Sequence, residues 1–429
     1  MTLNLRSLAF WSLDYLRGSP IGAHYSDVAR KIPSSSIQIR KDQELQFAKI
    51  LNHATQTTPF YQSFKDAKNL SDLPVINKLK ILDDYNLFRS SSFPGDNLKR
   101  MYTSGSTGVP FHIFQNSLKR TRVLADLIYF SGQVGYNVGE RHALFRIIDQ
   151  STAKSRLKLF LQNEILLNVI SQNNIILEHQ RNYLKRSAPV KALVGYASAL
   201  HALADYVLDK GDVPDSFRVQ GAICLSELLT PTAKATICKA FGCLVVSRYS
   251  NQECGVLAQQ RPGSNYFDIN TASFIVEILK TNNDDPAEPD EEGRIVVTDL
   301  YNMAMPLLRY DTGDTGIGTT MADGRFVLNE ISGRKADRLR DANDTTLSPF
   351  ALAGALHGIH GLRQYQVIQT SKAIYSVKIT SQQEVSHDKV AEALKSVLGE
   401  AVKLNIENVS ELPVLASGKR KAIVQNYYP

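Results

Sequence analysis

The sequence has few cysteines, and they lack the spacing typical of a metal site. The 429 residues include four of them, and no two form a Cys-x-x-Cys pair: Cys224, Cys238, Cys243 and Cys254. Zinc sites commonly draw on such pairs. We therefore expect buried, reduced thiols, as in cytoplasmic proteins, with zinc binding as the weaker alternative.

Long apolar runs are also missing. No uninterrupted apolar stretch approaches the roughly 20 residues that a membrane-spanning helix needs. Asp14 and Arg17 interrupt the apolar N-terminal run too early for a signal sequence. We expect a soluble, cytoplasmic protein without a transmembrane segment. Helical spacing of apolar side chains in residues 6–17 leaves two alternatives open, which are docking on the protein's own core and contact with a bilayer surface.

The two commonest nucleotide motifs are absent, and so is a nucleic-acid module. No Gly-Lys-Ser/Thr ending completes a Walker A loop, and no Gly-x-Gly-x-x-Gly follows a strand. The net charge is +7, but the positive charges are scattered rather than gathered in a stripe with interleaved aromatics. This argues against nucleic-acid partners and suits small polyanions such as ATP or coenzyme A.

The hydrophobic pattern predicts an α/β domain. Residues 41–57 and 117–133 have helical spacing, whereas residues 142–148 and 190–194 are short apolar runs typical of buried strands. A Thr-Pro start and a terminal glycine predict a helix over residues 230–241. A strand over residues 244–246 follows, so we expect Tyr249 and Glu253 on the loop after it, where ligands of α/β sheets usually bind.

A small α+β domain is predicted at the C-terminal end. From Ser348 onward we expect a compact helix, strands over residues 365–370 and 374–380, a helix over residues 387–398 and a strand over residues 402–408. Upstream, the acidic residues 282–292 predict an exposed turn between strands over 273–279 and 294–299. We place a large ATP- and acid-binding domain at residues 1–336 and a small mobile lid at 337–429.

The strongest functional pattern is Tyr-Thr-Ser-Gly-Ser-Thr-Gly-Val-Pro at residues 102–110. Glycine lets the backbone approach a polyphosphate, and several N–H and O–H donors converge there. The candidate phosphate-binding residues are Thr103, Ser104, Gly105, Ser106, Thr107 and Gly108. Taken alone, the stretch also fits an ordinary surface turn.

Four further stretches follow in order along the chain. The first two are Arg-Tyr-Ser-Asn-Gln-Glu at 248–253 and Arg-Tyr-Asp-Thr-Gly-Asp at 309–314. The last two are Gly-Arg-Lys-Ala-Asp at 333–337 and Leu-Pro-Val-Leu-Ala-Ser-Gly-Lys-Arg-Lys at 412–421. Together with the stretch at 102–110, they resemble the adenylate-forming superfamily of acyl-CoA synthetases and adenylation domains. The short N-terminal region most resembles the phenylacetate-coenzyme A ligase branch and its capsular polysaccharide relatives. The resemblance extends from about residue 95 to the end.

The resemblance implies ATP and Mg²⁺ as cofactors, and the residue types suit them. Glu253 is a hard oxygen ligand for Mg²⁺, and by resemblance Ser106 lies near the metal. Tyr249 offers a face for adenine, and Asp314 can accept hydrogen bonds from both ribose hydroxyls. The remaining implied contacts are Arg334 with ribose or phosphate, Ser226, Glu227 and Ser250 around adenine, and Lys419 as the mobile catalytic cation.

Simpler interpretations exist for each residue, and some positions depart from the superfamily's pattern. Asp311 and Asp314 also suit a hairpin turn, and Gly-Lys-Arg-Lys also suits a solvated basic tail. Departures are Ser226 and Ser250 in place of glycine, Gln252 in place of threonine and Phe111 in place of lysine. Ala336 occupies the usual hinge position, which leaves the hinge role of Asp337 open.

The resemblance implies an ATP-dependent, AMP-forming carboxylate ligase. It would form an acyl-adenylate and pass the acyl group to a thiol, including coenzyme A, or to an amine. Candidates for the acid pocket, by position, are Gly195, Tyr196 and Ser198. The capsule relatives suggest modification of surface polysaccharide. The alternatives are an aryl-CoA ligase of the phenylacetate type and a nucleotide-binding protein with impaired catalysis.

Overall fold

The computed structural model describes most of the chain. The described residues are 4–95, 98–103, 111–146, 154–169, 174–334, 339–342, 352, 355–356, 359, 361–381, 384–412 and 422–427. They fall into two compact units. Unit 1 is Met1–Glu140 with Arg248–Ile331, and unit 2 is Arg141–Ser247 with Ser332–Pro429. Each unit is therefore assembled from two separate parts of the chain.

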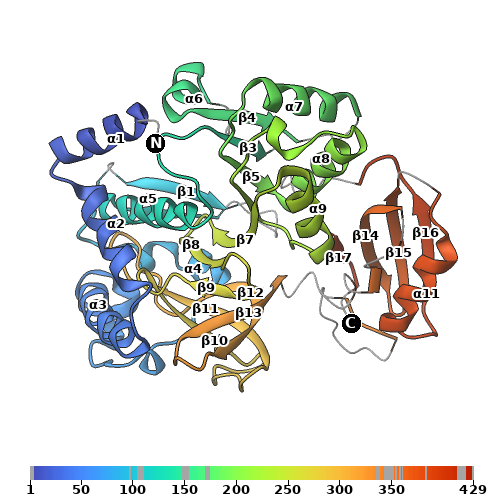
Figure 1. Cartoon of the computed structure of the whole chain (residues 1–429). Helices are drawn as coiled ribbons and strands as arrows, with labels where there is room; N and C mark the ends of the chain where they lie inside the picture. Colours follow the sequence, from blue (N-terminus) through green and yellow to red (C-terminus); the bar gives the residue numbers. More distant parts are fainter. Residues whose placement is uncertain are drawn as a thin grey trace. The chain divides into compact units, whose positions relative to one another are not determined.

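The first part of unit 1 is mainly helical. Its helices are α1 (Leu5–Leu16), α2 (Pro20–Lys31), α3 (Ser36–Thr57), α4 (Lys78–Asp83) and α5 (Ser117–Gly132). Figure 1 shows α2 beside α5, and the two helices are in contact. The predicted helices over residues 41–57 and 117–133 are confirmed as α3 and α5. Helix α3 begins five residues early because Ser35 Oγ accepts a hydrogen bond from the backbone N–H of Gln38.

The second part of unit 1 is a largely antiparallel sheet in the order β10-β11-β12-β13-β9-β8-β7. Its strands are β7 (Leu244–Asn251), β8 (Gly255–Gln260), β9 (Phe267–Ile269), β10 (Phe274–Leu279), β11 (Glu292–Asp299), β12 (Tyr310–Thr320) and β13 (Phe326–Arg334). The antiparallel pairing of β10 with β11 confirms the acidic turn predicted between them. A separate hairpin pairs β1 (Lys99–Thr103) with β2 (Phe111–Gln115).

Unit 1 has a large apolar core between its helices and its sheet. Phe60 and Phe88 stack at a centroid distance of 4.2 Å. Tyr61 is fully buried, and its hydroxyl donates to the carbonyl of Pro306 and accepts from the N–H of Leu308. The aromatic cluster that follows α3 is thus fixed to the chain segment that enters β12.

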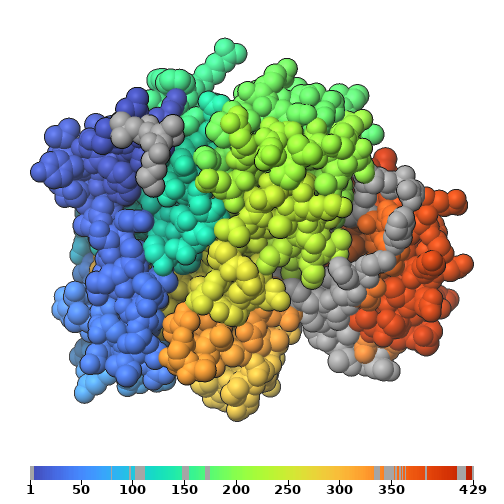
Figure 2. All heavy atoms as spheres, viewed as in Figure 1, coloured from blue at the N-terminus to red at the C-terminus, as the bar shows by residue number. Residues whose placement is uncertain are grey.

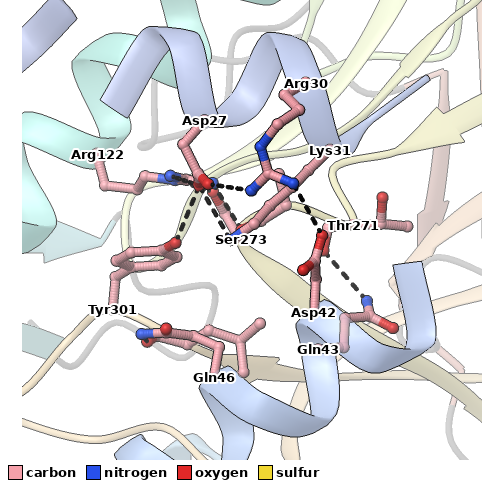
Figure 3. A network of polar contacts seen from close by, with 12 residues as sticks. Asp27, Arg30, Lys31, Asp42, Gln43, Gln46, Arg122, Thr271, Ser273 and Tyr301 are labelled. Carbon is pink, nitrogen blue, oxygen red and sulfur yellow. Dashed lines mark hydrogen bonds and ion pairs between the residues drawn. The ribbon is translucent and has the colours of Figure 1, made fainter. Parts of the chain in front are cut away.

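A buried network of charges ties α2 and α5 to the sheet (Figure 3). Arg122 is fully buried, and its guanidinium donates to Asp27 and to Ser273 Oγ, both at 2.7 Å, and to the carbonyl of Ala272. One turn earlier in α5, Lys119 Nζ lies 2.7 Å from Asp299 Oδ2, and both side chains have no exposed area. Because both cations have an anion in contact, the desolvation of these charges is compensated.

The first part of unit 2 is a parallel sheet in the order β6-β5-β3-β4, as an α/β pattern predicts. Its strands are β3 (His142–Arg146), β4 (Glu164–Asn168), β5 (Ala192–Tyr196) and β6 (Gly221–Leu225), and its helices are α6 (Arg156–Gln162), α7 (Asn174–Arg186), α8 (Ala197–Asp209) and α9 (Pro231–Phe241). Thr230 caps the start of α9, and Gly242 ends it with φ of +61°, as predicted. Strand β5 begins two residues later than expected.

The C-terminal part of unit 2 is a small sheet in the order β16-β15-β14-β17. Its elements are β14 (Leu362–Ser371), β15 (Ile374–Ser381), α11 (His387–Leu398), β16 (Lys403–Asn408) and β17 (Ile423–Gln425). Val390 and Leu394 of α11 pack in a core with Tyr375 and Val377 of β15. The two strands, the helix and the strand predicted from residue 365 onward are confirmed in that order, whereas the compact helix expected from Ser348 falls mostly outside the described residues.

One local prediction is wrong. Strand β7 does not end at Val246 but continues to Asn251, so Tyr249 and Ser250 lie within a strand instead of on a loop. The strand continues because β8 pairs with its polar end, Ser250 opposite Val256 and Asn251 opposite Gly255. Glu253 does lie outside the strand, in the turn that joins β7 to β8.

Candidate functional site

The predicted phosphate loop joins the two strands of the hairpin in unit 1. Thr103 at the end of β1 is paired with Phe111 at the start of β2. Residues 104–110, which include Ser104, Gly105, Ser106, Thr107 and Gly108, lie outside the described residues, as does the side chain of Thr103. Their phosphate-binding and metal-binding roles stay predictions.

Strands β7 and β12 bring the predicted adenine and ribose residues together. The hydroxyl of Tyr249 donates to Asp314 Oδ2 at 2.8 Å and lies 3.2 Å from Thr312 Oγ1. Burial, together with the neighbouring Asp314 carboxylate, holds the pKa of Tyr249 well above its usual value. The phenol therefore stays protonated at neutral pH and acts as a donor to the carboxylate.

The predicted metal ligand is also held by a tyrosine. Glu253 is 9% exposed, and its Oε1 accepts a hydrogen bond from the hydroxyl of Tyr310 at 3.3 Å. Its backbone carbonyl accepts from Gln115 Nε2 at 3.0 Å, which fixes the turn to strand β2. Burial and the Glu253 carboxylate raise the pKa of Tyr310 well above its usual value, so this phenol also remains a donor.

The two aspartates of the Asp-Thr-Gly-Asp stretch have different surroundings. Asp311 Oδ1 accepts from the backbone N–H of Gly313 at 2.9 Å, and Asp311 Oδ2 lies 2.9 Å from the guanidinium of Arg294. Asp311 thus caps the bend, as the simpler interpretation proposed. Asp314 instead contacts Tyr249, which agrees with the nucleotide interpretation without testing its ribose role.

In unit 2, Glu227 and Ser198 lie at the carboxyl ends of neighbouring parallel strands. Glu227 Oε2 accepts from the backbone N–H of Ser198 at 2.8 Å, in the first turn of α8. This contact caps a helix whose preceding residue, Tyr196, offers no side-chain cap. Ser226 has φ of +63°, so the serine keeps the left-handed backbone that glycine favours at this turn.

Gly195 has a structural explanation of its own. A Cβ placed on it would lie 2.5 Å from the Cβ of Phe145 in the adjacent strand β3. Glycine is therefore required by the close approach of β5 and β3. The proposed places of Gly195, Tyr196 and Ser198 in an acid pocket stay predictions, because packing alone accounts for Gly195.

The remaining predicted site residues cannot be placed. Arg334 ends strand β13, but its side chain lies outside the described residues. Residues 335–338, with the two hinge candidates Ala336 and Asp337, and residues 413–421, with Lys419, also lie outside them. The roles of these residues stay predictions.

Sequence reasoning missed two residues whose hydroxyls contact the predicted site residues, Tyr310 with Glu253 and Thr312 with Tyr249. Tyr310 and Thr312 lie within the Arg-Tyr-Asp-Thr-Gly-Asp stretch, yet no role was assigned to either. The one available signal was their position in a stretch already singled out. Their partners lie 57 and 63 residues away along the chain, and only the folded sheet shows these contacts.

The four cysteines are free thiols, of which Cys224, Cys243 and Cys254 are buried. Burial raises the pKa of Cys224 and Cys254 well above the usual value and that of Cys243 to about 12. These three thiols are therefore protonated at neutral pH and are poor nucleophiles.

Known proteins resemble this chain over most of its length. Protein CapK of Staphylococcus aureus is 23% identical over 408 residues, which cover 90% of this chain and 88% of CapK. A phenylacetate-coenzyme A ligase of Thermus thermophilus is 25% identical over 329 residues, 70% of this chain and 72% of the ligase. The family model of the CapK C-terminal domain matches residues 340–426.

A solved structure shares the fold. 2-Hydroxyisobutyryl-CoA ligase, in the postadenylation state with R3-HIB-AMP, has a TM-score of 0.72 and 15% identity, and the match covers 91% of this chain and 90% of that one. The chain is thus similar in sequence to CapK and to a phenylacetate-coenzyme A ligase, and it shares its fold with an acyl-CoA ligase. Its fold is that of this ligase, a large N-terminal α/β domain followed by a smaller C-terminal α+β domain, as predicted. The boundary at residue 336 stays a prediction.

Proposed function

We propose that this protein is an AMP-forming ligase that works through an acyl-adenylate. In the first step, one oxygen of a carboxylic acid attacks the α-phosphorus of ATP, and pyrophosphate leaves. In the second step, a thiol or an amine attacks the acyl carbon, and AMP leaves. The phenylacetate-coenzyme A ligase relative and the acyl-AMP complex of the structural neighbour support this chemistry.

The observation that carries the proposal is the pairing of Tyr249 with Asp314 across strands β7 and β12. A carboxylate held in one orientation suits a ribose anchor, because its two oxygens can accept hydrogen bonds from two adjacent hydroxyls. The Tyr249 hydroxyl holds Asp314 from one side. The half-buried ring of the same tyrosine then offers a surface beside the ribose on which adenine would stack.

The buried turn at Glu253 suits Mg²⁺ better than a metal with an all-protein ligand set. Among the described residues, no group of three His, Cys, Asp or Glu side chains comes together. Mg²⁺ is usually bound by one or two carboxylates together with substrate phosphates and water. Bound with ATP, it would neutralise charge on the leaving pyrophosphate. Glu253, oriented by Tyr310, would be its carboxylate, and Ser106 would lie near it.

The proposal also extends to the acceptor of the acyl group and to the biological role of the protein. The CapK relative and the CapK-type C-terminal domain support a role in modifying surface polysaccharide, with an amine on a sugar as one acceptor. The phenylacetate-coenzyme A ligase relative favours a second candidate, in which the acceptor is the thiol of coenzyme A and the acid is aromatic. We propose that the protein acts in the cytoplasm, where ATP is available.

Acid-dependent release of pyrophosphate from Mg·ATP tests the proposal. A panel of aryl, amino and sugar acids should contain at least one that stimulates release, and coenzyme A and amino sugars then compete as acceptors for the adenylate. If ATP binds but no acid on the panel stimulates release, the protein is a nucleotide-binding protein and the ligase proposal fails.

The proposed role of Lys419 gives a sharper version of this experiment. A lysine that contacts the α-phosphate only in the transition state affects the rate rather than ATP affinity. Lys419→Ala should therefore slow release about 10²- to 10³-fold and leave ATP affinity nearly unchanged. Lys421→Ala, in the same basic stretch, is the matched control and should retain normal rates. If both variants release pyrophosphate at the same rate, the Gly-Lys-Arg-Lys stretch is only a solvated basic tail.

A further inference from the structure

Helix α1 is oriented with its polar side inward. Asp14 is 4% exposed, and its carboxylate accepts from the backbone N–H groups of Ile21 at 3.0 Å and Gly22 at 2.8 Å, in the first turn of α2. A carboxylate at this place satisfies two donors that the helix itself cannot satisfy. The only acidic residue of α1 therefore faces the interior and caps α2.

Two further contacts fix the orientation of α1. The ring of Trp11 packs against Tyr25 of α2 at a centroid distance of 5.8 Å. The side chain of Asn4, which caps α1, donates to the carbonyl of Val138 at 3.3 Å. Figure 1 shows α1 next to α2. The inward side of the helix is thus defined by specific contacts.

The outward side of α1 is apolar. Its large hydrophobic side chains have exposed fractions between 53% and 79%: Leu5, Leu8, Leu13, Tyr15 and Leu16. At about 100° per residue these positions lie on one half of the helix, with Ala9 and Ser12 between them. The dark blue atoms of this N-terminal region lie at the molecular surface in Figure 2. A helix of a globular protein normally buries such a face.

This face bears on the two alternatives that the sequence left open for residues 6–17. Docking on the protein's own core accounts for Trp11, but Leu8, Tyr15 and Leu16 remain exposed. Scattered exposed leucines need no explanation, whereas a contiguous apolar helix face indicates an interaction surface.

The charges around the face favour an anionic occupant. Arg6 lies within the first turn of α1, and the exposed Arg17 follows its last residue. Asp14 is directed inward, so α1 has no carboxylate on its exposed side, and the exposed Arg17 places a cation at its C-terminal end. The chain as a whole carries a net charge of +7. Anionic lipid headgroups are the partner that combines negative charge with an apolar layer beneath it.

The dimensions of α1 suit a position in the plane of a membrane. Its 12 residues span about 18 Å, less than the roughly 30 Å of a hydrocarbon core. Within the described part of the chain, no helix is long and apolar enough to cross a bilayer. We propose that α1 docks this protein on an anionic lipid bilayer, with Leu5, Leu8 and Leu16 inserted at the headgroup boundary.

Sedimentation with lipid vesicles tests this proposal on the full-length protein. The protein should bind phosphatidylcholine vesicles that contain phosphatidylglycerol, and should bind weakly to vesicles of phosphatidylcholine alone. The variant Leu5→Ser/Leu8→Ser/Leu16→Ser should bind the anionic vesicles at least about tenfold more weakly, because three apolar side chains are lost. Absence of wild-type binding, or equal binding by this variant, would overturn the proposal.

A matched control separates this face from general surface hydrophobicity. Ile37, Leu45 and Val213 are exposed to 67%, 61% and 58% but do not lie on α1. The variant Ile37→Ser/Leu45→Ser/Val213→Ser should bind vesicles like the wild type. Arg17→Ser should weaken binding to anionic vesicles about fivefold and leave binding to neutral vesicles unchanged. A loss of binding in the control variant as large as in the α1 variant would contradict a role specific to α1.

If a partner other than lipid covers the apolar face of α1, the experiments give different results. If a second copy of the chain covers α1, light scattering shows a dimer that the α1 variant converts to a monomer, and the wild type leaves anionic vesicles unbound. If another protein covers it, the wild type is monomeric and also fails to bind vesicles. Either result overturns docking on lipid.

Discussion

Two polar clusters of unit 1 differ in the groups that contact their carboxylates. In the cluster around α5, Asp299 contacts the ammonium of Lys119. Asp27 contacts the guanidinium of Arg122, as Figure 3 shows. In the cluster on β7 and β12, Asp314 and Glu253 accept hydrogen bonds from the phenols of Tyr249 and Tyr310. A cation neutralises a carboxylate, whereas a neutral phenol orients it and leaves its charge in place.

The difference indicates separate purposes for the two clusters. Buried ion pairs join helices to a sheet, and breaking one leaves an uncompensated charge in the interior. In the proposed function, the carboxylates oriented by phenols would contact the ribose hydroxyls and the metal of a bound Mg·ATP. Substitutions in the first cluster should therefore affect stability, and those in the second should affect ligand binding.

The largest expected effect is a loss of stability when the buried ion pair of Lys119 and Asp299 is broken. Lys119→Met removes the cation beside Asp299, and the free energy of unfolding should fall by about 3–5 kcal/mol because a buried carboxylate is left uncompensated. Chemical denaturation measures the change. The double variant Lys119→Met/Asp299→Asn should recover much of the loss. If the free energy of unfolding of Lys119→Met falls by less than about 1 kcal/mol, the first cluster does not have the stabilising role that distinguishes it from the second.

The next effect is a pH dependence of stability centred on Asp126. Burial raises the pKa of this carboxyl to about 6 although Arg122 and Lys119 are close. The folded protein then holds a proton that the unfolded chain releases near its usual pKa of 3.8, so stability should fall as the pH rises from about 4 to 6. The fall attributable to this group is on the order of 2–3 kcal/mol.

Replacing the carboxyl tests that assignment. Asp126→Asn keeps the hydrogen-bonding shape beside Ser273 but cannot ionise, so the difference in unfolding free energy between the variant and the wild type should change across this pH range. Denaturation at a series of pH values measures it. Stability curves that run parallel between pH 4 and pH 7 would show that another group is responsible.

In the second cluster, Asp314→Ala should weaken ATP and AMP binding about 10- to 100-fold, because hydrogen bonds to a charged group are lost. Its stability should change by less than about 1 kcal/mol. Asp311→Ala is the matched control, since Asp311 caps the neighbouring bend and contacts Arg294. Calorimetry with ATP and with 2′,3′-dideoxy-ATP decides the matter, and equal affinity of the wild type for both nucleotides would refute the ribose role.

The smallest expected effect concerns Tyr310. Tyr310→Phe removes the hydroxyl that orients Glu253, and the Mg²⁺ concentration needed for half-maximal pyrophosphate release should rise about tenfold. Tyr301→Phe is the control, because its hydroxyl contacts Asp27 in the other cluster, 3.4 Å away. A similar shift in Mg²⁺ requirement in both variants would indicate a general loss of packing.

The elements that the sequence predicted well carry their own local signals. Thr230 and Gly242 mark the two ends of α9, and Ser386 caps α11 through the N–H of Lys389. Capping depends on residues within one turn, so it can be found in the sequence. The end of β7 was missed because its polar residues are held by pairing with β8, which is a tertiary contact.

The candidate site was predictable in its residue types but not in its contacts. Motif order located Tyr249, Glu253 and Asp314, but it gave no indication that Tyr310 would orient Glu253 across 57 residues. Motif position likewise gave no indication that the close approach of Phe145 requires a glycine at residue 195. The sequence also indicated that α1 is amphipathic, but which face would be buried depended on Asp14 capping α2.

Isotope transfer tests the central claim most directly. An acid that stimulates pyrophosphate release is prepared with ¹⁸O in its carboxylate and converted with ATP and acceptor, and the phosphorus products are analysed by mass spectrometry. Because the carboxylate oxygen that attacks the α-phosphorus stays with AMP when the acyl group leaves, we predict one ¹⁸O atom in each AMP formed. Label in inorganic phosphate, or AMP without label, would contradict an acyl-adenylate intermediate and with it the proposed function.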